Sequence, residues 1–197
     1  RNLLKQERSS SGKTDGRFTP AEKLRNMLPQ PTSYRILKTT EKNMSAEERL
    51  EALGIELPEP PKPVANYVTN MIVDRCLYVS GHGPAPLEGA KLTGKLGADL
   101  DVEAGYVAAR QTGLSILATV RSSLGSLDKV ERVIKLLGMV NATPDFLEHP
   151  KVINGCSDLF VDVFGEERGR ASRSAVGFSS LPGAIATEIE AIFLIGE

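Results

Sequence analysis

The sequence predicts an α+β fold with the element order ββαβαββ, in which two helices cover one face of a mixed β-sheet. Two segments, residues 102–124 and 151–164, have apolar residues at helical spacing. Shorter runs rich in Val, Ile and Leu flank them and have the length of strands. Because both helices are expected on the same face, the opposite face needs a cover, and we expect a second copy of the chain to supply it.

A β-hairpin is expected at the start of the sheet. Residues 64–68 and 71–73 form its first strand, residues 76–80 form its second, and the polar pair at 74–75 makes a tight turn. A loop rich in Gly and Pro follows, with a short strand near residues 91–96.

The signals at the ends of the two helices are local. Asp101 is a good N-cap for the first helix, and Gly125 can end that helix in the left-handed conformation. Gly165 is expected to end the second helix. Between the helices, residues 130–140 predict a strand that is buried on both faces for part of its length.

Two final strands, at residues 174–178 and 185–195, surround a Leu-Pro-Gly turn and predict a second hairpin. In the last strand, Glu188 and Glu190 alternate with apolar residues, so both carboxylates share one face.

The amino-terminal region divides into two parts. Residues 1–43 hold ten Lys or Arg against four Asp or Glu, whereas the rest of the chain holds 14 against 21. This basic segment has no sustained periodicity, and we expect a dispensable disordered tail, with organelle targeting or a non-native origin as alternatives. Residues 44–63 predict a short helix with a capping box and a Pro-rich lead-in, and residues 64–197 predict the main domain.

Composition limits the classes of function. The 197 residues are 41% hydrophobic, which suffices for one core, and only 5% are aromatic, with no Trp, which disfavours base stacking on nucleic acid. No run approaches the roughly 20 apolar residues of a membrane span. The two cysteines and two histidines lack metal-site or disulfide spacing. We therefore expect no metal site, no nucleic acid, no membrane partner, and a cytoplasmic setting.

The motif that points most clearly to a chemistry is Arg173 followed by Ser174 at the start of one strand, with Glu188 on the next strand. An Arg can present a two-pronged donor to a carboxylate, and a Glu can accept a proton from water. The same two residues are also compatible with a plain cross-strand ion pair. Asn154 has a capping or a binding use, and spacing alone leaves these alternatives open.

Several segments together resemble the RidA (YjgF) family, with order and spacing that agree from residue 64 to residue 195. These segments are residues 63–68, 77–81, 124–130, 140–146, 173–178 and 188–192. The lead-in at residues 53–63 resembles a subgroup with a longer amino terminus. The resemblance implies a chorismate-mutase-like protomer that forms a homotrimer with clefts between subunits.

The resemblance also implies an activity, the hydrolysis of reactive enamines and imines such as 2-aminoacrylate to a 2-keto acid and ammonia, without a metal or cofactor. Arg173 would hold the substrate carboxylate, and Glu188 would position or deprotonate the attacking water. The other residues implied to form or support the cleft are Tyr67, Ser80, Gly81, Asn154, Ser174 and Ala175.

This chain departs from the family pattern at three positions. Ala175 replaces a frequent Cys, Thr187 replaces an aliphatic residue, and His82 stands where Gln is common, which suggests a changed substrate range. One alternative is a non-catalytic trimer that binds a small carboxylate or protects other proteins. An endoribonuclease activity, reported for some relatives, is poorly supported by an acidic domain with few aromatics.

Overall fold

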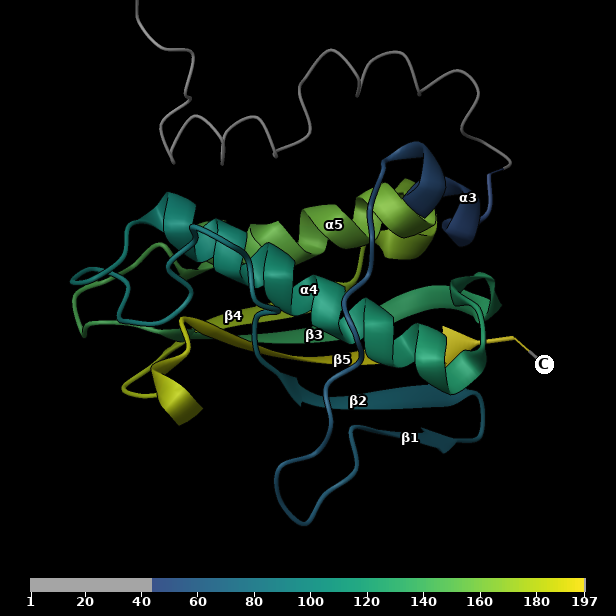
Figure 1. Ribbon diagram of the computed structural model, residues 1–197, viewed down its shortest axis with the longest axis horizontal. Helices are drawn as coiled ribbons and strands as arrows, with labels where there is room; N and C mark the ends of the chain where they lie inside the picture. The colour runs from purple at the N-terminus through teal and green to yellow at the C-terminus, as the bar shows by residue number, and fades with distance from the viewer. Residues whose placement is uncertain (1–43, 197) are drawn as a thin grey trace, which may run out of the picture.

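The computed structural model describes residues 44–196, so the expected tail at residues 1–43 lies outside the described residues. A short helix precedes the ββαβαββ core that the sequence predicts (Figure 1). In chain order, the elements are α3 (Ala46–Ala52), β1 (Asn70–Val73), β2 (Cys76–His82), α4 (Val102–Leu124), η2 (Leu127–Lys129), β3 (Val130–Asn141), α5 (His149–Gly169), β4 (Ser172–Phe178), η3 (Pro182–Ala184) and β5 (Thr187–Ile195).

The five strands form one mixed sheet in the order β1-β2-β5-β3-β4. Only β3 and β4 run parallel, and the other neighbours are antiparallel. Helices α4 and α5 pack against each other and against the same side of the sheet (Figure 1). The predicted mixed sheet with two helices on one face is therefore confirmed.

The expected hairpin of the last two strands is wrong, because β3 lies between β4 and β5. The unit β3–α5–β4 is a parallel crossover, in which the helix carries the chain across the sheet and the new strand pairs beside the first. This crossover puts β4 at the outer edge of the sheet. The chain then returns through η3, and β5 fills the place between β3 and β2.

The amino-terminal hairpin is confirmed, but its first strand begins later than expected. Residues 70–73 pair with β2, whereas residues 64–68 are irregular, and Val64 is 93% exposed. The regular pairing of this edge strand stops at Asn70 and Val79, although β2 itself continues to His82. The Oγ of Ser80 instead donates a hydrogen bond to the carbonyl oxygen of Val68 (2.7 Å). At residues 91–96, only isolated bridges replace the expected strand.

The helix ends follow the local signals in two of three cases. Asp101 accepts a hydrogen bond from the backbone N–H of Ala104, and Gly125 adopts a left-handed conformation with φ of 82°. Gly165 does not end α5: it has φ of 79° and ψ of 163°, and helical residues resume after this kink.

Glycines bring the elements of the core into close contact. A Cβ added to Gly138 on β3 would lie 2.6 Å from a carbon of Ile153 on α5. A Cβ added to Gly155 on α5 would lie 2.0 Å from the backbone oxygen of Tyr106 on α4. Real Cβ atoms do not approach other atoms so closely, so α5 can sit this near the sheet and α4 only because these side chains are absent.

Helix α3, at the start of the described residues, packs on the same core. Its capping box at Ser45 and Glu48 is present as predicted. Leu50 is only 3% exposed and belongs to the hydrophobic core. The carboxylate of Glu47 accepts a hydrogen bond from the backbone N–H of Leu127 (2.9 Å), which fixes α3 to the turn after α4.

Candidate active site

Arg173 occupies an unusual position, because its side chain extends from the edge strand β4 to helix α5. Its Nη1 donates hydrogen bonds to Asn154 Oδ1 (2.8 Å) and Ser157 Oγ (3.0 Å). Both partners are neutral, and no carboxylate within residues 44–196 forms a salt bridge with Arg173. The half-buried guanidinium is thus held in place while its charge remains available to an anion.

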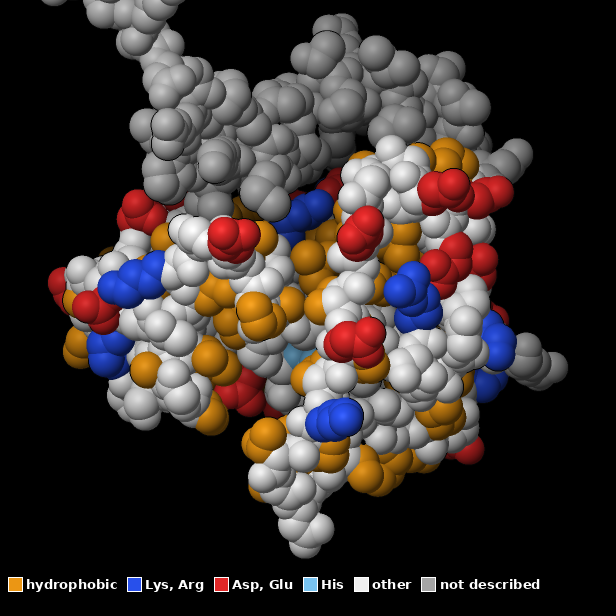
Figure 2. All heavy atoms as spheres, viewed as in Figure 1, with side chains coloured by type: hydrophobic (Ala, Val, Ile, Leu, Met, Phe, Trp, Pro, Cys, Tyr) orange, Lys and Arg blue, Asp and Glu red, His pale blue; other side chains and the backbone are white. Residues whose placement is uncertain are grey.

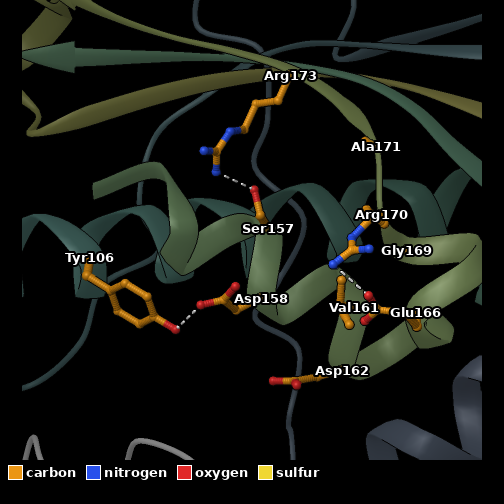
Figure 3. A pocket seen from close by; sticks show the side chains of 10 residues that line it. All are labelled: Tyr106, Ser157, Asp158, Val161, Asp162, Glu166, Gly169, Arg170, Ala171 and Arg173. Carbon is orange, nitrogen blue, oxygen red and sulfur yellow. Dashed lines mark hydrogen bonds and ion pairs between the residues drawn. The ribbon is translucent and has the colours of Figure 1, made fainter. Parts of the chain in front are cut away.

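Arg173 borders a pocket of about 610 Å³ between α4, α5 and the start of β4 (Figure 3). The pocket is lined by Tyr106, Ser157, Asp158, Val161, Asp162, Glu166, Gly169, Arg170, Ala171 and Arg173. Its volume falls within the range typical of small-molecule sites.

A hydrogen bond spans the pocket from helix to helix, with the Tyr106 hydroxyl donating to Asp158 Oδ2 (2.9 Å; Figure 3). Burial and the neighbouring Asp158 carboxylate raise the pKa of Tyr106. The phenol therefore stays protonated at neutral pH and remains a donor. Sequence reasoning missed Tyr106, Ser157 and Asp158. The only available signal was the helical spacing that places residues 154, 157 and 158 on one side of α5.

Glu188 lies on β5 against the backbone of Gly81. A Cβ added to Gly81 would lie 2.1 Å from Glu188 Oε1, so the carboxylate fills the space that a side chain at 81 would need. Burial, followed by the nearby charge of Glu190, raises the pKa of Glu188. A carboxylate with a raised pKa is a better proton acceptor near neutral pH than an ordinary one.

Arg173 and Glu188 lie on opposite faces of the sheet. Successive side chains of a strand point to opposite faces. On β5, the hydroxyl of Thr187 hydrogen-bonds Thr112 of α4 (2.9 Å), so Glu188 points away from the helices. Arg173 contacts α5 and therefore points toward them. The expected placement of these two residues on adjacent strands is wrong, because β3 separates them.

The other predicted site residues divide between these two faces. Ser174 faces the open side, where its Oγ accepts a hydrogen bond from Lys135 Nζ (3.1 Å), and Ala175 packs against the core. Ser80 lines a smaller pocket of about 310 Å³ on the open side. Tyr67 is 44% exposed in the irregular segment before β1 and does not line the pocket at Arg173.

His82 does not face either pocket, in contrast to the expectation that it changes the substrate range. It is buried under α4, where its Nε2 lies 2.8 Å from Thr119 Oγ1 and its Nδ1 lies 2.6 Å from the carbonyl oxygen of Ser80. Burial lowers the pKa of His82, so the ring is neutral at pH 7. Its role is structural, since it ties β2 to α4.

Two classes of site are absent from the part of the chain that the structure describes. No group of three or more His, Cys, Asp or Glu side chains is arranged to hold a metal ion. Among the described helices, none has both the length and the apolar character that crossing a membrane requires.

The fold and the charged pocket define a class of protein: a small α+β chain with an open sheet face and, on its edge strand, an arginine that forms no salt bridge with a described carboxylate. The sequence model of the family described as "YjgF/chorismate_mutase-like, putative endoribonuclease" matches residues 47–186. The chain belongs to this family, which confirms the resemblance inferred from the sequence.

Individual relatives agree with this assignment. "Protein TCP17" of Trypanosoma cruzi is 45% identical over 143 residues, which are 73% of this chain and 89% of the relative. The crystal structure of Atu1372 from Agrobacterium tumefaciens, a protein described as of unknown function, is 44% identical with a TM-score of 0.69, covering 77% of this chain and 92% of that one. A structure from Shewanella oneidensis, described as a "putative endoribonuclease", is 35% identical with a TM-score of 0.72, covering 77% and 100%.

Proposed function

We propose that this protein hydrolyses reactive enamines and imines derived from amino acids to 2-keto acids and ammonia, without a cofactor. The observation that gives it most support is the environment of Arg173, a half-buried cation with two neutral hydrogen-bond partners and no carboxylate partner among the described residues. Such a group binds a small carboxylate strongly, because a charge-assisted hydrogen bond is about twice as strong as a neutral one.

The separation of Arg173 from Glu188 supports a site that is completed by a second copy. One protomer presents the carboxylate anchor on one face and the proton acceptor on the other, so a small substrate cannot touch both in the same chain. We propose that Arg173 of one subunit faces Glu188, Gly81 and Ser80 of the next, in a homotrimer.

The open face of the sheet has the surface that such an assembly requires. Five large apolar side chains of this face remain exposed: Met71, Val73, Tyr78, Val176 and Phe178. Apolar side chains also gather along the edge formed by β1 and β2 (Figure 2). Several large apolar side chains exposed on one sheet face favour burial of that face against another subunit.

The proposed reaction begins when the enamine or imine takes up a proton from solvent to become an iminium ion, with its carboxylate on the guanidinium of Arg173. Glu188 accepts a proton from water while the water oxygen bonds to the iminium carbon, which gives a neutral carbinolamine. Glu188 then returns the proton to the nitrogen, the carbon–nitrogen bond breaks as the hydroxyl becomes a carbonyl, and ammonia leaves with the released proton as ammonium. Positioning of the water and the raised pKa of Glu188 both lower the barrier.

A second candidate is a trimer that binds a small carboxylate without turning it over. The structure offers one observation in its favour, because the pocket at Arg173 is formed within a single chain and Glu188 is not part of it. In this case Asn154 and Ser157 would suffice to hold the anchor.

The test couples an amino-acid oxidase or a PLP-dependent dehydratase to the protein and follows 2-keto acid formation. We expect wild type to accelerate the reaction, and Arg173→Ala and Glu188→Gln each to abolish most of that acceleration. If wild type gives no acceleration over buffer while a carboxylate still raises its melting temperature, the deaminase proposal is refuted and the binder remains.

Co-assembly of the two inactive variants tests the shared site. In randomly mixed trimers, roughly a quarter of the clefts combine an intact Arg173 with an intact Glu188 from different subunits, so activity should partly return. If mixed trimers stay as inactive as either parent, the two residues do not act across an interface.

A further inference from the structure

We infer that the pocket beside Arg173 selects ligands that carry a carboxylate and, several atoms away, a cationic nitrogen. In terms of substrates, this class comprises imines of amino acids with basic side chains. The statement about substrates rests on the proposed function, whereas the binding preference is argued from the residues of the pocket alone.

The argument starts from the charges that line the pocket. Asp162 forms a salt bridge with Arg110 (3.4 Å), and the side chains of this pair are only 8% and 13% exposed. Glu166 forms a salt bridge with Arg170 (2.7 Å). These two salt bridges neutralise Asp162, Glu166 and Arg170, which are three of the five charged residues that line the pocket.

One cation and one anion of the pocket have no ionic partner among residues 44–196. Among the described residues, Arg173 donates hydrogen bonds only to Asn154 and Ser157, and Asp158 accepts one only from the neutral Tyr106. Neither Arg173 nor Asp158 forms a salt bridge with a described residue. A ligand with one charge of each sign complements both groups at once, whereas a simple carboxylate complements only Arg173.

The geometry separates these two charges. Ser157 and Asp158 are consecutive residues of α5, yet the Ser157 hydroxyl reaches Arg173 on β4 while the Asp158 carboxylate reaches Tyr106 on α4 (Figure 3). A ligand that binds both charged groups must therefore extend from Arg173 on β4 past Ser157 to Asp158. The volume of about 610 Å³ leaves room for a longer side chain.

Tyr106 orients the carboxylate of Asp158, which is the anionic group of the pocket. Its hydroxyl donates to Asp158 Oδ2, so the carboxylate points across the pocket, and Oδ1 receives no donor from the described residues. A ligand ammonium or guanidinium can therefore bind Asp158 without displacing the tyrosine. Because Asp158 is exposed, we expect a preference of modest size.

Binding of three probes to the full chain tests the inference by calorimetry: 6-aminohexanoate, hexanoate and hexylamine. We expect 6-aminohexanoate to bind roughly 3-fold to 10-fold more tightly than hexanoate, and hexylamine to bind worst. Asp158→Asn keeps the size of the side chain and an acceptor for Tyr106, and it should remove the advantage of 6-aminohexanoate while leaving hexanoate unchanged. Glu166→Gln, at a carboxylate already paired with Arg170, should leave the advantage intact.

Equal binding of 6-aminohexanoate and hexanoate, or an advantage that survives Asp158→Asn, would overturn the inference. An oxidase-coupled assay then separates this failure from failure of the proposed function, with arginine and norleucine as the two imine precursors. Acceleration of both imines without preference for the arginine-derived one refutes the selectivity and keeps the deaminase. Selective binding of 6-aminohexanoate with no acceleration of either imine refutes the deaminase and keeps the selectivity.

Discussion

The contact between Gly81 and Glu188 offers a direct test of the catalytic carboxylate, through the substitution Gly81→Ala. The new Cβ would lie 2.1 Å from Glu188 Oε1, whereas real Cβ atoms stay at least 3.0 Å from other atoms. The carboxylate must therefore retreat by about 1 Å. Because a flexible side chain can make this shift cheaply, we expect the free energy of unfolding to change by less than about 1 kcal/mol.

The effect on activity should be much larger than the effect on stability. A displacement of about 1 Å at a reacting group lowers turnover by roughly 100-fold, which is also the lower bound of what general acid or base catalysis contributes. The assay is 2-keto acid formation in the oxidase-coupled system, with unfolding in urea measured on the same preparations.

Two controls make the result decisive. Gly196→Ala places a Cβ no closer than 3.5 Å to any atom and should leave turnover unchanged. In a Glu188→Gln background, Gly81→Ala should cause little further loss, because both changes act on the same group. Full activity of Gly81→Ala, or an equal loss in both backgrounds, would show that the position of Glu188 does not matter to the reaction.

Three further substitutions test other parts of the structure. Arg173→Lys should raise KM and lower kcat/KM at least about 10-fold, since an ammonium lacks the planar fork; an unchanged KM would exclude Arg173 as the carboxylate anchor. Leu50→Ala should lower the free energy of unfolding by about 2–4 kcal/mol in urea, whereas the exposed Glu51→Ala should not; equal effects would mean that α3 is not part of the core. The pKa of His82 is lowered by burial, so the folded state favours the neutral ring, and stability should fall as pH drops below 6.5, the ordinary value. Urea unfolding at pH 5 and pH 7 should show a smaller fall for His82→Gln, and an identical fall would contradict this assignment.

Local signals in the sequence were enough to predict the helices. Asp101 and Gly125 act at the ends of α4 through contacts within one turn, so their effect is visible in a short stretch of sequence. Gly165, like Gly125, is a glycine that follows a run of apolar residues at helical spacing. In the structure it produces a kink, and the helix continues to Gly169. The signal marks a break in the helix and does not show whether the helix restarts.

Contacts between distant segments were not predictable in the same way. β4 lies outside β3 because of the way α5 crosses the sheet. Strands that are neighbours in the sequence, such as β4 and β5, are therefore not neighbours in the sheet. Tyr106 and Asp158 are 52 residues apart, and only the packing of α4 on α5 brings them together. Family resemblance pointed to Arg173 and Glu188, but it did not reveal that one chain holds them on opposite faces.

The close approach of α4 and α5 at Gly155 has a consequence for how this pocket can evolve. The contact is between backbone atoms, since a Cβ at 155 would lie 2.0 Å from the carbonyl oxygen of Tyr106. The spacing of α4 and α5 beside the pocket is therefore set by main chain, while Tyr106 and Asp158 contribute side chains that line the pocket. Substitutions at these two positions can reverse the charge preference of the pocket while the spacing of the two helices stays the same, so specificity can diverge in this protein with the scaffold held constant.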